Sequence, residues 1–216
     1  MFAAIFDWDG VIIDSSRQHE LSWHQMASEI GRELPAGFFK KSFGMKNEKI
    51  IPELLGWATE KEAVGKIARR KEAIYREMIK KNGIEALPGV HDLLEQLHAA
   101  KIPCAVGSSS ARENISCIID VLGVAKYFNV IVCGEDVHRG KPDPEVFQIA
   151  ASRLGMTPDK SVVFEDAHVG LEAARAAGMK VIGVATTHPA ETLSDADLVV
   201  HRLTEVTMEK LRGLFS

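Results

Sequence analysis

Two aspartates stand one residue apart at the end of the first apolar run of the chain. Residues 2–6 are apolar, as is typical of a buried strand in a parallel sheet, and Asp7-Trp8-Asp9-Gly10 follows directly. On a continuing strand Asp7 and Asp9 would point to the same side, because side chains alternate, and Trp8 would point away to pack. Two neighbouring carboxylates repel each other, and a divalent cation between them relieves the repulsion. A solvated acidic turn is the better interpretation of such a pair when it stands alone.

Three further groups that could take part in a reaction follow other predicted strands: Ser108, Lys141 and the acidic pair Glu165-Asp166. The carboxyl ends of the strands in an open parallel sheet carry the chemistry of such folds, so we expect these groups in one site with the two aspartates. Each has an ordinary alternative, since a serine or an acidic residue can cap a helix and a lysine in a turn is usually solvated. Their joint occurrence in this order favours a catalytic site.

The elements that must position these groups fall into two patterns. From residue 87 onward helix and strand patterns alternate, which predicts a parallel sheet covered on both faces. Between residues 15 and 86 apolar residues recur at helical spacing, and no strand pattern appears. We therefore expect an α/β fold: a Rossmann-like, doubly wound parallel sheet core from residues 1–14 and 87–216, with an inserted all-helical cap at 15–86. The later strands are expected at 103–106, 130–133, 161–164, 181–184 and 198–200.

Two helices of the insert have clear boundary signals. Ser15 or Ser16 can cap a first helix whose apolar positions are Leu21, Met26, Ala27 and Ile30. Residues 59–62 read Thr-Glu-Lys-Glu, which fits a capping box, and Gly83 ends the long helix that follows.

The composition excludes several function classes. The chain has 216 residues, 46% of them hydrophobic and 26% charged, with a formal net charge of -4. That charge gives no reason to expect nucleic acid or an anionic membrane as a partner. No apolar run approaches the roughly 20 residues that a membrane helix needs, and no signal peptide is recognisable. Three scattered cysteines without a CxxC pair indicate free thiols in a reducing compartment. We expect a cytoplasmic monomer.

The order of the four groups resembles the haloacid dehalogenase-like superfamily. Its phosphatases carry DxDG, a Ser or Thr after a second strand, a Lys and a terminal acidic pair, in the order found here. The resemblance covers essentially the whole chain. The helical insert directly after the first motif is similar to the mobile cap of the subgroup that contains β-phosphoglucomutase and small sugar phosphatases.

The resemblance implies a role for each acidic residue, and elementary chemistry agrees. Asp7 would be the nucleophile that forms an aspartyl phosphate, and Asp9 the general acid and then the base that activates water. Mg²⁺ suits an all-oxygen site. Its implied ligands are Asp7, Asp9 through its backbone carbonyl, and Asp166, with Glu165 supporting nearby.

Phosphate binding is assigned to the groups after the second and third strands of the expected core. Ser108, with the amides of Ser109 and Ser110 at a helix start, can hold phosphate oxygens. Lys141 can neutralise the charge that builds on them, which makes Ser108 and Lys141 catalytic with the aspartates. Arg112, after the serines, resembles the phosphatases more than the mutase and is a candidate substrate-binding residue.

Three residues of the insert are further candidates for binding the substrate. His19 and Lys71 resemble cap residues of the mutase, although a core or surface histidine explains His19 equally well. Asn47 stands where the mutase has an arginine that holds a second, distal phosphate. A neutral amide lacks the forked cation that binds a dianion, so this position favours a phosphatase.

The sequence therefore predicts a Mg²⁺-dependent phosphatase that acts on a small phosphorylated metabolite, such as a sugar phosphate. The alternative within the enzymes is a β-phosphoglucomutase-like phosphosugar mutase. From another class, a non-catalytic regulator that binds a phosphate ligand remains open, although the intact set of catalytic groups argues against it. Dehalogenation is disfavoured because that branch lacks the second aspartate. Phosphonate hydrolysis is disfavoured because no cap lysine stands between residues 14 and 36.

Overall fold

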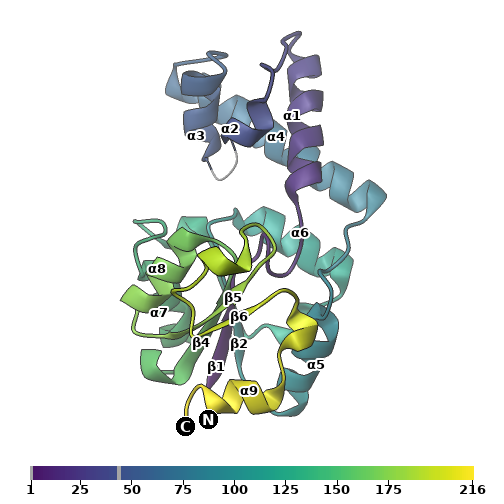
Figure 1. Cartoon of the computed structure of the whole chain (residues 1–216). Helices are drawn as coiled ribbons and strands as arrows, with labels where there is room; N and C mark the ends of the chain where they lie inside the picture. The colour runs from purple at the N-terminus through teal and green to yellow at the C-terminus, as the bar shows by residue number, and fades with distance from the viewer. Residues whose placement is uncertain (1, 43–44) are drawn as a thin grey trace. The chain divides into compact units, whose positions relative to one another are not determined.

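The computed structural model of the chain describes residues 2–42 and 45–216. These residues form two compact units, of which the first comprises the chain up to Asp14 together with Ile84–Ser216 and the second comprises Ser15–Gly83 (Figure 1). The division into domains drawn from the sequence, with its second boundary between 86 and 87, stays a prediction.

The described part of the first unit contains one sheet of six parallel strands in the order β3-β2-β1-β4-β5-β6. The strands are β1 (Ala3–Phe6), β2 (Cys104–Gly107), β3 (Val130–Val132), β4 (Ser161–Glu165), β5 (Lys180–Val184) and β6 (Leu198–Val200). The order confirms the predicted doubly wound fold. Because the chain winds outward in both directions from the pair β1 and β4, the carboxyl ends of these two strands flank the point where such folds bind ligands.

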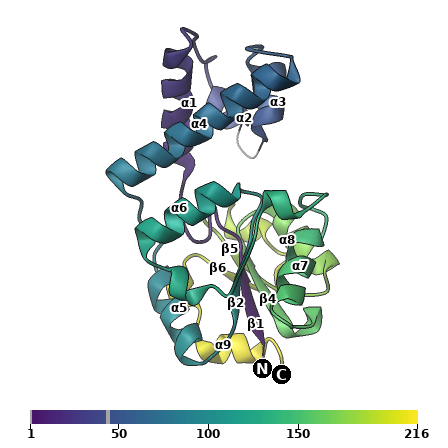
Figure 2. The ribbon, with the colours of Figure 1, turned by 180° about the vertical axis from the view of Figure 1, so that it is seen from behind.

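Helices cover both faces of this sheet, with α7 and α8 on one side and α5 and α6 on the other (Figure 2). The helices of the first unit are α5 (Val90–Ala99), α6 (Arg112–Leu122), α7 (Glu145–Arg153), α8 (His168–Ala176) and α9 (Met208–Gly213). Short 3₁₀ turns are η2 (Ala125–Tyr127), η3 (Gly134–Asp136), η4 (Pro158–Lys160), η5 (Ala190–Thr192) and η6 (Leu203–Glu205).

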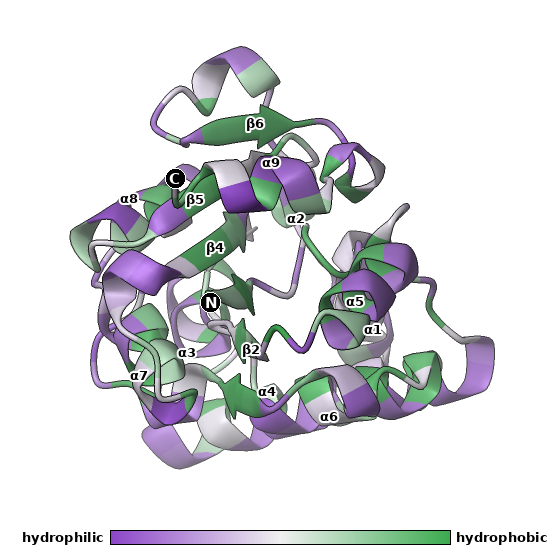
Figure 3. Cartoon of the chain, turned by 90° about the horizontal axis from the view of Figure 1, so that it is seen from below, coloured by the Kyte–Doolittle hydropathy of each residue, from purple (hydrophilic) through white to green (hydrophobic). Residues whose placement is uncertain are grey.

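Apolar strands explain why both faces are covered. Ile5, Phe147 and Leu171 belong to one buried cluster between the sheet and the helices α7 and α8. On β1 and β4, Phe6 and Phe164 stack with ring centroids 4.5 Å apart. Strands such as β2 and β4 are accordingly hydrophobic, whereas the helices mix hydrophobic and hydrophilic residues (Figure 3). A strand that is apolar on both sides is stable only between two layers of helices.

In its described residues the second unit contains helices joined by loops and turns, and no strand. Its elements are α1 (Ser16–Glu29), α2 (Phe38–Ser42), α3 (Asn47–Lys49), a π-helical turn η1 (Ile50–Leu54) and α4 (Lys61–Asn82). Trp23, Ile51 and Ala68 form the centre of its small core. The long helix ends where the sequence predicts, because Gly83 adopts φ +76°, a backbone conformation that favours glycine.

Two details of the second unit differ from the sequence-based expectation. Leu21 and Ile30 were predicted to lie on the buried face of the first helix, but they are 44% and 37% exposed. The prediction of this face was therefore partly wrong. The buried face instead follows the large ring of Trp23. The capping box was also displaced, because Glu60 holds the N-cap position of α4 and makes no side-chain cap hydrogen bond.

The two segments that lead into and out of the second unit run side by side within the first. Ile13 pairs with Ala86 in an antiparallel bridge, and the backbone N–H of Leu87 donates to the carbonyl of Ile12 at 2.9 Å. The insertion therefore begins and ends at one place on the sheet unit. Of the helices in the described residues, none combines the length and the apolar character that crossing a membrane requires.

Candidate active site

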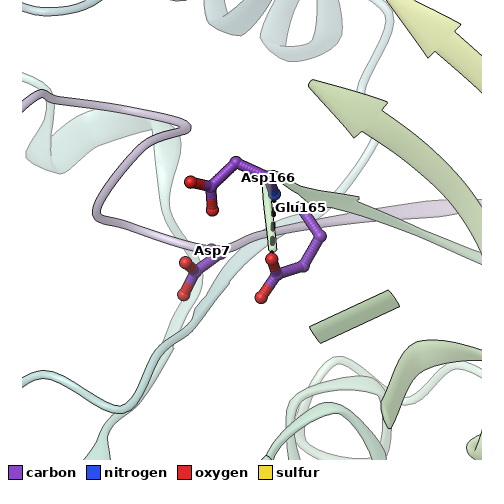
Figure 4. Close-up of side chains that lie close together, drawn as sticks. All are labelled: Asp7, Glu165 and Asp166. Atoms are coloured by element: carbon purple, nitrogen blue, oxygen red, sulfur yellow. Dashed lines mark hydrogen bonds between the residues drawn. The ribbon is translucent and has the colours of Figure 1, made fainter. Parts of the chain in front are cut away.

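Three carboxylates meet at the carboxyl ends of β1 and β4. The backbone N–H of Asp7 donates to the carbonyl of Phe164 at 2.9 Å, which extends the β1–β4 ladder to the first aspartate. Glu165 ends β4 and Asp166 follows it. One ligand oxygen from each of the three side chains lies within 4.8 Å of the others, and Figure 4 shows the three side chains side by side. All three residues are buried.

Lys141 supplies the positive charge beside these acids. Its Nζ atom donates to Oδ1 of Asp7 at 2.8 Å and to Oε1 of Glu165 at 2.5 Å. Burial opposes the ammonium charge, but the attraction of Asp7 and Glu165 outweighs it and raises the pKa of Lys141 above its usual value. The other Glu165 oxygen accepts from the backbone N–H groups of Asp166 and Ala167, both at 2.9 Å. Glu165 is thus held at both oxygens.

A negative charge on Asp166 is disfavoured, and Lys141 offsets this only in part. Burial first, and then the charges of Asp7 and Glu165, raise the pKa of Asp166 to about 8. The Thr187 hydroxyl hydrogen-bonds to Oδ2 of Asp166 and lies 3.1 Å from its backbone carbonyl oxygen. Carboxylates crowded in this way, with hard oxygen donors, are the ligand set that fits Mg²⁺.

Gly10 makes room for this arrangement. Its φ is +84°, and a Cβ atom on Gly10 would lie 2.0 Å from Oδ2 of Asp166. A residue with a side chain is therefore excluded twice, by backbone strain and by overlap with the carboxylate. This explains physically why a glycine follows the second aspartate.

Strand alternation does not decide where the Asp9 side chain lies. β1 ends at Phe6, so the alternation does not extend to Asp9, which lies in the turn that follows. Oδ2 of Asp9 accepts a hydrogen bond from the Ser110 hydroxyl at 2.5 Å. In the described part of the chain, the carboxylate group suited to a metal contains Asp7, Glu165 and Asp166 and not the Asp9 side chain. A metal contact through the Asp9 backbone carbonyl stays a prediction.

The serine loop, residues 108–110, connects β2 to α6. Ser108 is 2% exposed; its backbone N–H donates to the Val132 carbonyl at 3.0 Å, and its hydroxyl oxygen accepts from the Ser110 N–H at 3.1 Å. Arg112 begins α6, and its guanidinium donates to Asp136 instead of standing alone. Its predicted role in binding the substrate stays a prediction.

The three candidates of the helical unit lie in one hydrogen-bonded network. Lys71 Nζ is 2.7 Å from Nδ1 of His19 and 2.9 Å from Oε1 of Glu72, and the Asn47 amide donates to the same Glu72 oxygen at 2.7 Å. An ammonium only donates, so Nδ1 of His19 accepts and the ring is neutral. Burial first, and then Lys71, lower the pKa of His19 to about 3. The ring stacks on Tyr75 at 4.1 Å.

Three further residues have contacts that bear on the site: Trp8, Thr187 and Asp136. Trp8 is 1% exposed and packs edge-on against Phe128, at a centroid distance of 6.0 Å, as the expected packing residue. The sequence reasoning missed Thr187 and Asp136. Thr187 follows a predicted strand, so the same strand-end rule would have found it. Asp136 lies in the turn η3, for which the sequence offered no signal.

The chain is similar to known proteins both in sequence and in structure. The family model described as haloacid dehalogenase-like hydrolase matches residues 4–184. A chloroplastic 5-amino-6-(5-phospho-D-ribitylamino)uracil phosphatase of Arabidopsis thaliana is 39% identical over 98% of this chain, which spans 57% of that protein. The β-phosphoglucomutase of Bacillus subtilis is 34% identical over 98% of this chain and 94% of its own. A crystal structure titled HAD hydrolase, family IA, variant 3, from Entamoeba histolytica HM-1:IMSS is 30% identical with a TM-score of 0.88, covering 100% of this chain and 99% of that one.

Proposed function

Because the chain belongs to the haloacid dehalogenase-like hydrolase family, we propose that it is a Mg²⁺-dependent phosphatase of a small phosphorylated metabolite, such as a sugar phosphate. The proposed activity is that of a phosphoric monoester hydrolase. The observation that carries the proposal is the buried group of Asp7, Lys141 and Asp166 at the ends of β1 and β4. The proposed nucleophile, a cation and carboxylates suited to a metal lie together there.

Asp7 is the proposed nucleophile, and Asp9 the proposed acid and base. An oxygen of Asp7 forms a bond to phosphorus while the bond from phosphorus to the leaving oxygen breaks, which gives an aspartyl phosphate. Asp9 donates a proton to the leaving oxygen. It then takes a proton from a water molecule, whose oxygen attacks phosphorus and regenerates Asp7. The hydrogen bond from Ser110 supports the role of Asp9, because it holds the carboxylate in one direction.

Ser108 and Lys141 are proposed to hold the phosphoryl oxygens during these steps. The Ser108 hydroxyl and the amides of Ser109 and Ser110 stand between β2 and α6, where N–H groups suit an anion. Lys141 already touches Asp7, so it lies next to the point of attack and can offset the charge that builds on phosphate.

Asp7, Asp166 and the backbone carbonyl of Asp9 are the residues proposed to hold Mg²⁺, with Glu165 beside them. The fit rests on the geometry of the side chains of Asp7, Glu165 and Asp166, whose ligand oxygens lie within 4.8 Å of one another. Burial and the two neighbouring carboxylates raise the pKa of Asp166, which agrees with a site that lacks a positive charge. When bound, the ion offsets the repulsion between an anionic nucleophile and an anionic phosphate.

The network of the helical unit favours a phosphatase over a mutase. Asn47 is a neutral amide, and its donor is already directed to the Glu72 carboxylate. Glu72 also pairs with Lys71, so the charge of this lysine is shared with an acid inside the protein. A mutase must hold a second phosphate dianion, and this network offers little net positive charge for one.

A small phosphorylated molecule is thus the proposed substrate, and the substrate-binding roles of His19, Asn47, Lys71, Ser109 and Ser110 are part of the proposal. Direct substrate binding by Arg112 stays a prediction from the sequence. The monomeric state, the cytoplasmic location, and the absence of nucleic-acid and membrane partners stay predictions. Size-exclusion chromatography with light scattering tests the first of them.

The decisive experiment measures phosphate release from sugar phosphates, nucleotides, phosphoglycolate and pyrophosphate, with and without Mg²⁺. The panel includes the phosphorylated ribitylaminouracil named for the Arabidopsis relative. Release that needs Mg²⁺ and is abolished by Asp7→Asn supports the proposal. Asp197→Asn, at the amino end of β5, is the matched control and is expected to keep full activity.

Other outcomes would support one of the two alternative functions. Interconversion of glucose 1-phosphate and glucose 6-phosphate, primed with the bisphosphate and without net phosphate release, would establish the mutase. Tight binding of a phosphorylated ligand in calorimetry, with no turnover of any kind, would establish the regulator.

A further inference from the structure

The serine loop is attached to the turn η3 by its backbone. β2 and β3 are neighbouring parallel strands, and the segments that follow them stay paired beyond the sheet. The Gly134 N–H donates to the Ser110 carbonyl at 3.1 Å. A Cβ atom on Gly134 would lie 2.6 Å from the Ser109 carbonyl oxygen, so the two backbones meet closely. Whatever fixes η3 therefore also fixes the serine loop.

Asp136 fixes η3. Its Oδ2 atom accepts from the N–H and the Sγ atom of Cys133, both at 2.9 Å, and its Oδ1 atom accepts from Arg153 on α7 at 3.0 Å. Burial raises the pKa of Cys133 to about 12, so the thiol keeps its proton and donates it. The Asp136 side chain is only 15% exposed and carries several hydrogen bonds at once.

The same turn holds the other end of the serine loop. The Arg112 guanidinium donates to Oδ2 of Asp136, and the Arg112 backbone N–H is shared between the two carboxylate oxygens of Glu135, at 3.2 Å each. Arg112 is the first residue of α6 and follows the serines after one residue. The loop is therefore held at Ser110 through its backbone and at Arg112 through both backbone and side chain.

We propose that Asp136 is a positioning residue for phosphate binding: it ties Arg112 and η3 together and thereby places Ser108, Ser109 and Ser110 around the phosphoryl group. This inference rests on the proposed function, in which these serines hold phosphate. It assigns Arg112 a role in the scaffold, in contrast to direct contact with the substrate.

The test compares Asp136→Asn with the wild type, using inorganic phosphate as a competitive inhibitor. Both carboxylate oxygens of Asp136 accept hydrogen bonds, so an amide in either orientation sets an N–H group against a donor. The inhibition constant for phosphate and the KM of the substrate are expected to rise about tenfold, since misplacement of binding groups by a fraction of an ångström is costly. kcat is expected to fall by a smaller factor, since Ser110 of the same loop also donates to Asp9.

Arg112→Gln separates the two roles of the arginine. If Arg112 acts through the scaffold, this variant weakens phosphate binding as Asp136→Asn does, and the double variant is no weaker than either single one. If Arg112 instead binds the substrate and Asp136 merely restrains it, Asp136→Asn releases the guanidinium and phosphate binds more tightly. Tighter binding, or an unchanged inhibition constant, overturns the inference.

The control variant is Asp197→Asn, since Asp197 also accepts from a backbone N–H, that of Val181 at 2.8 Å, and pairs with a cation, Lys180, at 3.4 Å. It lies at the amino end of β5, away from the serine loop, so phosphate inhibition is expected to match the wild type. Should Asp136→Asn fail to fold, Arg153→Gln removes one donor to Asp136 and keeps its other hydrogen bonds, so the inhibition constant is expected to rise by a smaller factor. An unchanged inhibition constant in that variant also overturns the inference. Failure of the proposed function looks different, because the wild type itself then releases no phosphate.

Discussion

The Ser110 hydroxyl donates a hydrogen bond of 2.5 Å to Oδ2 of Asp9, across the junction between the segments that follow β2 and β1. Hydrogen bonds from a neutral donor to a carboxylate are short and strong. The residue proposed as general acid and base is therefore oriented by a residue of the proposed phosphate-binding loop. Placement of phosphate and placement of the proton donor are linked in this way.

Ser110→Ala is expected to lower kcat/KM about tenfold or more, because a hydrogen bond to a charged group contributes about 1.5–3 kcal/mol. The loss should be large for an alkyl phosphate, whose leaving oxygen needs a proton, and small for p-nitrophenyl phosphate, whose leaving group departs as an anion. Steady-state kinetics with both substrates provide the measurement. The comparison uses kcat/KM, which reports the first step, because Asp9 also activates water in the second step with either substrate. An equal loss of kcat/KM on both would contradict the orientation of Asp9 by Ser110.

Removal of Mg²⁺ with EDTA is expected to lower the melting temperature, because bound metal at 100 times its dissociation constant stabilises the folded protein by about 2.7 kcal/mol. In Asp166→Asn, the metal-free protein should be more stable than the metal-free wild type, since the substitution removes a buried carboxylate whose pKa is raised to about 8 by burial, Asp7 and Glu165. The same variant should show no stabilisation by Mg²⁺. Thermal unfolding with and without Mg²⁺ checks both, and a Mg²⁺-dependent shift retained in Asp166→Asn would argue against this ligand.

Gly10→Ala is expected to abolish Mg²⁺-dependent activity and to destabilise the fold. The new Cβ atom would lie 2.0 Å from Oδ2 of Asp166, in addition to the strain at φ +84°. Gly31→Ala is the matched control, since φ is +62° there and no described atom lies within 4 Å of a Cβ. The control is expected to lose only the strain energy, roughly 1–2 kcal/mol. Urea unfolding and activity assays of both variants separate strain from overlap.

The stability of the protein should depend on pH through His19. Burial and Lys71 lower the pKa of His19 from 6.5 to about 3, so between these values the unfolded chain binds a proton that the folded chain does not. The free energy of unfolding therefore falls as the pH falls from about 6.5 toward 3, by at most about 1.4 kcal/mol per pH unit. Above pH 6.5 this contribution is fully present.

His19→Asn, which can still accept from Lys71, is expected to flatten this dependence. The measurement is the free energy of unfolding by urea at several pH values, compared with His91→Asn on the exposed surface. An identical slope for His19→Asn and the wild type would contradict a neutral, buried His19.

Much of the proposed site could be predicted because it obeys a single geometric rule. Asp7, Ser108 and Lys141 each follow a strand, and Glu165 ends one. Apolar strands with turn residues after them are visible in the sequence. The parallel order of the strands then brings these groups to one edge. The metal-type group of Asp7, Glu165 and Asp166 follows from the pairing of β1 with β4.

The other features of the site and the fold could not be predicted, because they depend on contacts between residues far apart in the sequence. The direction of the Asp9 side chain is decided by Ser110, 101 residues away, and the orientation of Arg112 by Asp136 in a short 3₁₀ turn. The buried face of α1 is decided by where Trp23 finds its partners, so Leu21 remained exposed although its spacing was suitable. Tertiary packing selects among such locally equivalent faces.

The bridge between Ile13 and Ala86 has a consequence for the evolution of such proteins. The sheet unit is already closed by its own hydrogen bonds where residues 15–83 leave and return. The entropy cost of closing a loop grows only slowly with its length, so inserts of very different size can be attached at this point. The sheet unit can therefore exchange its insert as a module without any change at the strand ends that carry Asp7, Glu165 and Asp166.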